Sequence, residues 1–296
     1  MNDSKDILAV GSIAFDTIET PKGRREKILG GSSTYFSVSS SLYTNVSLIG
    51  IVGKDFKREN WDIFKKYNIN VDSVEKSDGL TFSWGGKYNH DFSKRDTLFT
   101  ELGVFEQFKP NIVNSYNQPI LYLGNIQPDL QFDVISKVKK PHLIAADSMN
   151  LWIDLFPEKV KELIKKVDIF LLNDEEAIQL SGHNNLNKIV SEFLSYGPKI
   201  VIIKMGSKGS VIGFENEIIR LSCVPNVEVV DPTGAGDSFA GGVLGYIAQH
   251  GMKNPVKAVM HGTAVASFTV SAFGLENLYN TQLNIVDEKI KEIKIL

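Results

Sequence analysis

Short, continuous apolar runs recur along the chain and alternate with stretches of mixed polarity. Six of these runs predict β-strands: Ile7–Ile13, Val46–Val52, Ile120–Leu123, His142–Ala146, Ile169–Leu172 and Ile200–Ile203. Most lack a regular alternation of apolar and polar positions, as expected when helices cover both faces of a parallel sheet. Helical patterns lie between them, the clearest in Pro157–Val167, where the apolar residues share one helical face. The pattern predicts an α/β protein with a doubly wound, mostly parallel sheet, whose ligands bind beyond the carboxyl ends of the strands.

Two segments interrupt this rhythm and are predicted to form β-hairpin-like additions away from the main sheet. Residues 17–29 are polar and basic, and residues 80–102 are aromatic and contain glycines. We interpret them as a small β lid over an active site, with a dimer contact or a plain surface addition as the alternatives. Asp91, Arg95 and Asp96 could reach a substrate from the second segment, although a charged flap face is usually only solvated. No linker or repeat divides the chain, which predicts one domain over residues 1–296.

Composition narrows the classes of partner. The 296 residues carry 32 Lys and Arg against 35 Asp and Glu, a formal net charge of −3, and 43% of them are hydrophobic. This balance gives no electrostatic support for nucleic acid or an anionic membrane, so we predict that neither is a partner. Cys223 is the only cysteine, which excludes an intrachain disulfide and any zinc or iron–sulfur site built from several cysteines.

The longest uncharged stretch lies between Lys257 and Glu276. Its length suggests a membrane helix, but it contains His261 and several hydroxyl side chains, which are too polar for lipid. We therefore predict a buried helix there. The N-terminus is polar and acidic and lacks the basic flank of a signal peptide, so the sequence predicts a cytoplasmic protein.

The most informative segment, VVDPTGAGDSFAGG, begins at Val229. Its β-branched start predicts a strand, Gly234 and Gly236 predict a tight turn, and a helix follows. Such a unit points backbone N–H groups and the positive end of a helix at one place, which favours a phosphate group or a developing oxyanion. Asp237, at the start of the helix, could either cap it or accept a proton from a substrate hydroxyl.

A structural role and a dinucleotide site are two alternatives for this segment. If its role is only structural, the glycines turn the chain and Thr233 or Asp237 caps the helix. A dinucleotide site would need an acidic residue about 20 positions after the glycines, but residues 238–275 contain no Asp or Glu. The chain also lacks the sequence G-x-x-x-x-G-K-[ST], which excludes a P-loop enzyme.

The twelve residues from Asp231 to Gly242, DPTGAGDSFAGG, closely resemble the C-terminal signature of the PfkB, or ribokinase-like, family of small-molecule kinases. Weaker matches extend over nearly the whole chain, at Gly11–Asp16, Gly30–Gly31, Gly50–Asp55, Asn173–Glu176 and Lys204–Gly209. The resemblance implies a three-layer αβα sandwich of the ribokinase-like fold with a small β lid. It also implies transfer of the γ-phosphoryl group of ATP to a hydroxyl, usually a CH2OH, of a sugar or a nucleoside.

The same resemblance assigns roles to the glycine-rich turn. Asp237 would be the general base that takes the hydroxyl proton, and the migrating phosphoryl group would occupy an anion hole formed by Gly234, Ala235 and Gly236. These roles are physically coherent, because phosphoryl transfer needs mainly alignment and charge neutralisation, and oriented amides supply both.

A nucleotide site and a metal site are also implied. The residues implied to contact the nucleotide are Asn173, Lys204, Gly206, Gly209, Thr233 and His261. Asn173 and Glu176 would help to place Mg²⁺ through water, because Mg²⁺ keeps much of its hydration shell; the alternative is a helix N-cap and a first-turn acid. For His261 the alternative is a core histidine. In some members of the family, positions that match Asp231 and Thr233 help to bind a monovalent cation such as K⁺.

The acceptor side follows the family less closely. The residues implied to bind the acceptor are Asp16, Gly30, Gly31, Tyr35 and Asp147. Relatives of the ribokinase type usually carry Lys and Asn where this chain has Ser32 and Tyr35, which argues against ribose itself. Tyr35 and Phe36 could stack on a purine or a sugar face, or they could be core residues of a helix. For Asp147 a loop cap is the alternative.

The leading hypothesis is therefore an ATP-dependent carbohydrate kinase, with a nucleoside kinase as the alternative. A relative that binds a ligand without catalysis would have no need for a base at Asp237. We expect a sugar or a nucleoside as the partner, ATP and Mg²⁺ as cofactors, and a homodimer through the β lid as one possible assembly.

Overall fold

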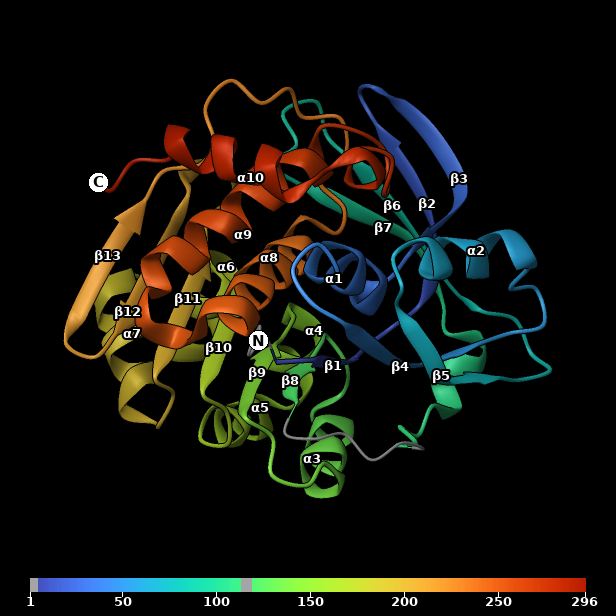
Figure 1. Cartoon of the computed structure of the whole chain (residues 1–296), viewed down its shortest axis with the longest axis horizontal. Coiled ribbons are helices and arrows are strands. Elements are labelled where there is room, and N and C mark those ends of the chain that lie inside the picture. The colour runs from blue at the N-terminus through green and yellow to red at the C-terminus, as the bar shows by residue number, and fades with distance from the viewer. Residues whose placement is uncertain (1–4, 113–118) are drawn as a thin grey trace.

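The computed structural model describes residues 5–112 and 119–296 (Figure 1). Part of the N-terminus that we considered for a signal peptide, residues 1–4, lies outside the described residues.

Within these ranges the main sheet has nine strands, of which all adjacent pairs are parallel except those that involve β12. Their order is β13 (Glu217–Leu221), β12 (Ser210–Phe214), β11 (Ile200–Lys204), β10 (Ile169–Asn173), β9 (Leu143–Asp147), β8 (Ile120–Leu123), β1 (Ile7–Val10), β4 (Val46–Val52) and β5 (Asn70–Lys76). All six predicted strands belong to this sheet. The prediction of a mostly parallel, doubly wound sheet is confirmed.

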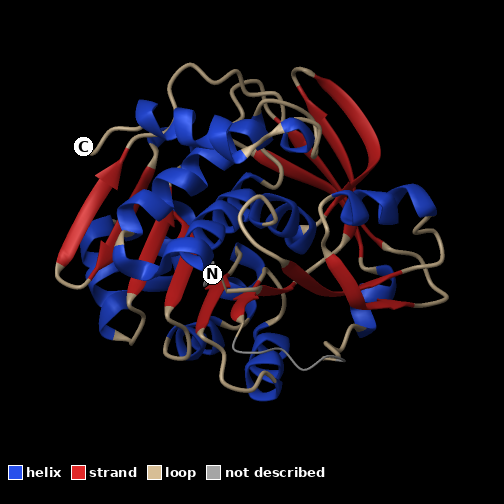
Figure 2. Cartoon of the chain, in the orientation of Figure 1, coloured by secondary structure: helices blue, strands red, loops and turns tan. Residues whose placement is uncertain are grey.

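Helices cover both faces of the main sheet (Figure 2). One face packs against α1 (Ser32–Ser40), α2 (Arg58–Lys66), α8 (Ala235–His250), α9 (Pro255–Val270) and α10 (Leu283–Lys289). The other packs against α3 (Pro128–Lys137), α4 (Asn150–Leu155), α5 (Pro157–Ile164), α6 (Asp174–Ser181) and α7 (Leu186–Ser195). Alternate residues of β1 point to opposite faces, since Ile7 packs with the first set and Leu8 with the second, and both are buried. The three-layer αβα sandwich is therefore confirmed.

Short 3₁₀ helices complete the connections: η1 (Gly103–Gln107), η2 (Gly206–Lys208), η3 (Gly251–Lys253), η4 (Leu278–Asn280) and η5 (Ile290–Glu292). Helices α8 and α9 cross at glycines, because a Cβ on Gly242 would lie 2.9 Å from the Cα of Gly262. The uncharged stretch predicted to be a buried helix is largely α9, and it is buried. Among the helices of the described ranges, none combines the length and the apolarity needed to cross a membrane.

A second sheet is formed by the two segments that interrupt the sequence pattern, and we call it the lid sheet. Its strands are β3 (Gly23–Gly30), β2 (Ala14–Thr20), β6 (Phe82–Tyr88) and β7 (Arg95–Glu101), in that order, with β2 and β6 parallel. It stands beside the sandwich, next to α1 and α2 (Figure 1). The run predicted as one strand over Ile7–Ile13 ends instead at Val10, because the chain leaves the main sheet there and enters the lid sheet at Ala14.

Candidate active site

The glycine-rich turn forms the start of helix α8. Gly234 is the N-cap and adopts a positive φ of 74°, a conformation that glycine tolerates and other residues rarely adopt. The amide of Ala235 donates to the carbonyl of Pro232 (3.2 Å), and the first bond into the helix runs from Ser238 to Gly234 (2.9 Å). The Asp237 amide donates to its own carboxylate. In the described part of the chain, the amides of Gly234 and Gly236 are therefore the ones left at the helix end to bind an anion.

The strand predicted before this turn is absent, so that prediction is wrong. Val230 and Asp231 both donate their amides to the carbonyl of Val270, at 2.7 and 3.2 Å. Because the end of α9 supplies this acceptor, the β-branched pair has no neighbouring strand to join. The turn is thus anchored to α9 rather than to the main sheet.

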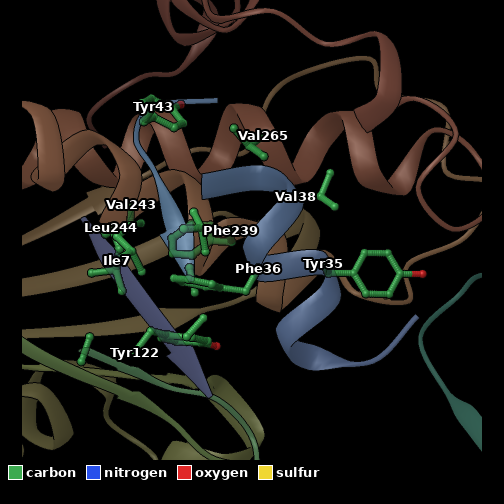
Figure 3. Packing of buried hydrophobic residues seen from close by; sticks show 14 of the residues in the cluster. Ile7, Tyr35, Phe36, Val38, Tyr43, Tyr122, Phe239, Val243, Leu244 and Val265 are labelled. Atoms are coloured by element: carbon green, nitrogen blue, oxygen red, sulfur yellow. The ribbon is translucent and has the colours of Figure 1, made fainter. Parts of the chain in front are cut away.

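Tyr35 fills the space beneath the turn. A Cβ on Gly234 would lie only 2.4 Å from the Tyr35 ring, so any larger residue would displace either the ring or the turn. Tyr35 is 1% exposed and belongs to the same core cluster as Phe36 and Phe239, although its ring points away from theirs (Figure 3). Its hydroxyl has no hydrogen-bond partner among the described residues. The ring is therefore a buried support for the turn, which agrees with the core interpretation rather than with stacking on a ligand.

Asp237 lies in the first turn of α8 and does not act as its cap. Part of its surface stays exposed, yet burial raises the pKa of its carboxyl to about 7. The negative charge of Asp147 raises this pKa further, whereas the Lys204 ammonium lowers it. A carboxyl that titrates near neutrality is suited to accept a proton from a hydroxyl.

Lys204 and Asp147 form a buried ion pair beside Asp237. The Lys204 Nζ lies 2.5 Å from the Asp147 Oδ2, and their side chains are 15% and 5% exposed. The Asp147 Oδ1 accepts a hydrogen bond from the amide of Ser148 (3.0 Å). Both oxygens of Asp147 thus have protein partners, and its role on the acceptor side stays a prediction.

Asn173 and Glu176 form a reciprocal capping box at the start of α6. The Asn173 Oδ1 accepts from the Glu176 amide, and the Glu176 Oε2 accepts from the Asn173 amide, both at 2.8 Å. The helix-start interpretation is therefore what the structure shows. Burial also raises the pKa of Glu176 to about 7, although the nearby Lys204 ammonium lowers it. We call Asp147, Asn173, Glu176 and Lys204 the sheet-edge group.

Asp16 is a second buried carboxylate, on strand β2. It is 4% exposed, and burial, followed by the charges of Asp231 and Asp237, raises its pKa to about 7. The amide of Gly31 donates to it and lowers the pKa, as does the charge of Arg95. A Cβ on Gly30 would lie 1.9 Å from the Asp16 Oδ2. The double glycine therefore holds the Asp16 carboxylate: Gly31 donates its amide, and Gly30 leaves the space that the carboxylate occupies.

The lid sheet adds Trp84 and Tyr88, which sequence reasoning did not single out as site residues, and Arg95, which it did. The Tyr88 hydroxyl lies 3.1 Å from the Thr233 Oγ1, which connects β6 to the glycine-rich turn. The Arg95 guanidinium lies over the Trp84 ring, 5.0 Å from its centre. Because Trp84 pairs in register with Asp16, these residues extend the Asp16 side of the site. We call Asp16, Tyr35, Trp84, Tyr88 and Arg95 the lid-side group.

Comparison with known proteins decides the family. The model of the pfkB family carbohydrate kinases matches residues 133–282. An ATP-dependent 6-phosphofructokinase of Thermoanaerobacterium thermosaccharolyticum is 34% identical over 91% of this chain and 89% of its own length. The chain belongs to the pfkB family of carbohydrate kinases. It is thus a phosphotransferase with an alcohol group as acceptor, in a family of sugar and nucleoside kinases.

Two further relatives of this pfkB-family kinase differ in their named substrates. A cytidine kinase of Thermococcus kodakarensis is 27% identical over 81% of this chain and 87% of its own length. The solved structure of a putative ribokinase II from E. coli, in complex with ATP and Mg²⁺, superposes with a TM-score of 0.81 over 97% of this chain and 99% of its own, at 19% identity. This likeness confirms the ribokinase-like fold.

The kinase carries a further glycine turn between β11 and β12. Gly206 and Gly209 have φ values of 55° and 86°, and a Cβ on Gly209 would lie 1.9 Å from the carbonyl oxygen of Leu221. Glycine is therefore required at position 209. The turn begins directly after Lys204, at the carboxyl edge of the main sheet, where the family resemblance implies the nucleotide.

His261 lies in a different group of residues. Its Nδ1 lies 3.1 Å from the Tyr43 hydroxyl, and its Nε2 lies 3.8 Å from the Asp287 Oδ1. Burial lowers its pKa to about 4, against the opposing effect of Asp287. None of these partners belongs to the sheet-edge or lid-side group, so His261 has the contacts of a core histidine.

Asp231 is buried within the turn and has partners for both oxygens. Its Oδ1 accepts from the amide of Thr233 (2.9 Å), and its Oδ2 accepts from the amide of Gly274 (3.2 Å). The carboxylate therefore fixes the turn.

Tyr122, on β8, escaped the sequence analysis because it looks like any apolar strand residue. It is fully buried, and its ring stacks on Phe36 with 3.6 Å between centres. Its hydroxyl has no partner within the described ranges, and burial, followed by the charges of Asp147 and Asp237, raises its pKa.

Proposed function

We propose that Asp237 of this kinase takes the proton from an acceptor hydroxyl while the γ-phosphoryl group of ATP is transferred to the oxygen. The observation that carries this proposal is the Asp237 carboxyl, whose pKa is about 7, next to the free amides of Gly234 and Gly236. The carboxylate can accept the proton at neutral pH, and the amides and the α8 dipole neutralise charge on the migrating group. A positioned base contributes about 10²–10⁴-fold to the rate.

Mg²⁺ fits this chain only as a partly hydrated ion. No group of three or more His, Cys, Asp or Glu residues within the described ranges could enclose a metal. Glu176 has one carboxylate oxygen engaged in the capping box and Asn173 has its side-chain oxygen engaged, so these residues would hold Mg²⁺ through its water molecules. When bound, the ion would neutralise phosphate charge. The nucleotide would lie over Lys204, Gly206, Gly209 and Thr233.

The monovalent-cation site rests on the family resemblance alone. Asp231 and Thr233, the residues that would contribute to it, are already joined through the Asp231 Oδ1 and the Thr233 amide. We therefore propose no role for K⁺ in the transfer of the phosphoryl group. Equal turnover in potassium and in N-methylglucamine buffers would show that K⁺ is not a cofactor.

The acceptor is a neutral, polyhydroxylated carbohydrate in this proposal. The lid-side end of the site brings together Asp16, Asp231 and Asp237, with two nearby cations, Arg95 near Asp16 and Lys204 near Asp237. Because Lys204 is already paired with Asp147, the excess of carboxyls disfavours a phosphate group on the acceptor, whereas vicinal hydroxyls can donate to the Asp16 carboxylate. Because Tyr35 is buried under the turn, the aromatic stacking that favoured a nucleoside loses its support.

The test is ADP release from Mg·ATP with pentoses, hexoses, sugar phosphates and nucleosides, for the native enzyme and Asp237→Asn. We expect release with neutral sugars and a loss of about 100-fold or more in the variant, with unchanged thermal unfolding. Release with nucleosides alone would establish the nucleoside alternative. Native turnover in Asp237→Asn would contradict the role of Asp237 as the base.

We also propose that two copies pair through the lid sheet. Strand β7 is an edge strand of that sheet, and Leu80, Leu98 and Leu102, on or next to its strands, are 57%, 47% and 42% exposed. Exposed edges with apolar side chains favour association. Sedimentation velocity should show a dimer that Leu98→Asp dissociates; a monomeric native protein would contradict the proposal.

A further inference from the structure

Lys204 reaches across the carboxyl edge of the main sheet to Asp147. Lys204 ends β11 and Asp147 ends β9, and β10 lies between these strands. The 2.5 Å contact therefore extends over the end of β10, where Asn173 pairs in register with Lys204. A long, flexible side chain is held in one place by this contact, which costs conformational entropy. The pair fixes where the ammonium lies.

That place is the underside of the glycine-rich turn. A Cβ on Gly236 would lie 3.2 Å from the Lys204 Nζ. The ammonium thus faces the N-terminal end of α8, which carries partial positive charge of its own. Two positive features that face each other at a helix end are unfavourable unless an anion lies between them. The nearby carboxylates offset part of this charge, and the Asp237 amide donates to its own carboxylate, but the Gly236 amide needs an acceptor of its own.

The ammonium has donors to spare for such an anion. Of its three N–H groups, one is used by Asp147 in the hydrogen bonds of the described residues. Burial works against its charge, but the carboxylates of Asp147 and Glu176 outweigh burial and raise the Lys204 pKa. Lys204 is therefore a permanent cation in the site, with free donors aimed at the turn.

We propose that Lys204 binds the migrating γ-phosphoryl group from the side opposite the Gly236 amide, and that Asp147 is a positioning residue that holds Lys204 there. This inference rests on the proposed function. In the step itself, the bond from the γ-phosphorus to the bridging oxygen of ADP breaks and a bond to the acceptor oxygen forms. The hydroxyl proton goes to Asp237, and Lys204 keeps all its protons while it neutralises charge.

The decisive variant removes both charges together. Replacing a buried ion pair by apolar residues is often neutral for stability, whereas removal of one partner leaves an unpaired buried charge. We therefore expect the double variant Asp147→Leu/Lys204→Met to have the same melting temperature as the native enzyme. Its kcat should fall about 100- to 1000-fold, and its acceptor KM should change less than about threefold. Lys199→Met is the matched control, because Lys199 pairs with Asp168 at the opposite end of the same strand; its kinetics should equal those of the native enzyme.

Two results would overturn the proposal. Native kcat in the double variant would show that the pair is only structural. An increase in acceptor KM without loss of kcat in Asp147→Asn would show that Asp147 binds the acceptor instead. Lys204→Arg should recover part of the rate lost in Lys204→Met, because the charge is kept; no recovery would argue against a role through charge.

Nucleotide binding without an acceptor separates this inference from the proposed function. By calorimetry, the double variant should bind Mg·AMP-PNP about 10- to 100-fold more weakly than the native enzyme, while Mg·ADP affinity stays within about twofold. This difference is measurable even if no acceptor in the panel is phosphorylated, in which case the proposed function fails and the role of Lys204 stands. Equal loss for both nucleotides, or no loss, would refute contact with the γ-phosphoryl group.

Discussion

The sheet-edge and lid-side groups differ in how completely their polar atoms are paired. In the sheet-edge group, Lys204 pairs with Asp147 and Asn173 pairs reciprocally with Glu176. In the lid-side group, Asp16 is held by one amide, and the buried Tyr35 hydroxyl has no partner within the described residues. The charges of the first group pair with one another as the chain folds and leave two N–H donors on Lys204, whereas the Asp16 carboxylate of the second keeps acceptor positions that a ligand could satisfy. Strong binding of acceptor hydroxyls is expected where such atoms remain.

The origin of the two groups explains this difference. Lys204, Asp147 and Asn173 end neighbouring strands of one sheet, so ordinary parallel pairing brings them together. The lid-side group joins residues from β2, β6 and β7 to Tyr35 of α1, a helix of the sandwich. Its geometry therefore depends on how the lid sheet packs against the sandwich.

The largest effect in the lid-side group is expected for Asp16→Asn. Loss of the negative charge weakens hydrogen bonds from acceptor hydroxyls, and charged hydrogen bonds contribute about 1.5–3 kcal/mol each. With two such bonds, acceptor kcat/KM should fall by at least about 100-fold. Mg·ATP affinity should stay native, because Asp16 lies in the lid-side group. Steady-state kinetics and calorimetry measure both, and a matching loss of ATP affinity would contradict the separation of the two groups.

The same substitution should affect stability in the opposite direction. The Asp16 pKa is raised from 3.8 to about 7 in the folded state, so folding binds a proton between these pH values and stability falls as pH rises through this window. Asp16→Asn removes that cost. At pH 8 the free energy of unfolding of the variant should exceed that of the native protein by on the order of a few kcal/mol, and its melting temperature should be higher. Near pH 4 the two proteins should melt at the same temperature. A lower melting temperature at pH 8 would show that the Asp16 charge is already well compensated.

The pH dependence of kcat/KM is expected to be a smaller effect than that of Asp16→Asn, but still a large one. Asp16 and Asp237 both have a pKa of about 7 and must be ionised to bind the acceptor and accept its proton. The rate should rise with pH and level off above about 7, with apparent values that belong to the interacting pair. Below that, the slope should approach two logarithmic units per pH unit, and it should fall to one in Asp16→Asn. A kcat/KM of the native enzyme that does not change between pH 5 and 7 would show that neither carboxyl has to be ionised for the reaction.

The part of the site that could be predicted from sequence is the part made by local chain geometry. The apolar runs identified the central strands, and Asp237 and the Gly30–Gly31 pair could be located because short motifs specify their backbone. Strand β5 was missed because its sequence, NVDSVEK, is polar and half exposed, as at many sheet edges. The strand predicted at Val229–Val230 was wrong for the opposite reason. The two residues favour a strand by their β-branched side chains, but no neighbouring strand lies beside them to pair with.

Partners far apart in sequence were not predictable from the chain. Asp147 and Lys204 are separated by 57 positions, and nothing local shows that one carboxylate pairs with that lysine. Tyr88 and Thr233 are separated by 145. Tyr35 and Phe36 have the composition of a stacking site, and only the packing under Gly234 and against Tyr122 shows that they are core residues.

A smaller effect is expected when the sheet-edge capping box is broken. Asn173→Ala removes the side chain that accepts from the Glu176 amide, and loss of such a cap costs about 1 kcal/mol. Chemical denaturation should show this loss, and Asn173→Asp should restore most of it. Because the helix end then holds Glu176 less firmly, the Mg²⁺ concentration for half-maximal turnover should rise. Unchanged Mg²⁺ dependence would assign Asn173 to the helix cap alone.

The smallest effect is expected at the contact between the lid sheet and the turn. Tyr88→Phe keeps the buried ring but removes the hydroxyl 3.1 Å from the Thr233 Oγ1, a bond that contributes about 0.5–1.5 kcal/mol. Acceptor KM should rise a few-fold while kcat stays native, because the lid sheet loses one connection to the turn. Thr233→Val removes the other partner, and the double variant should be no worse than either single one. Strictly additive effects in this cycle would show that the two hydroxyls act independently and that the lid sheet is held by its apolar contacts.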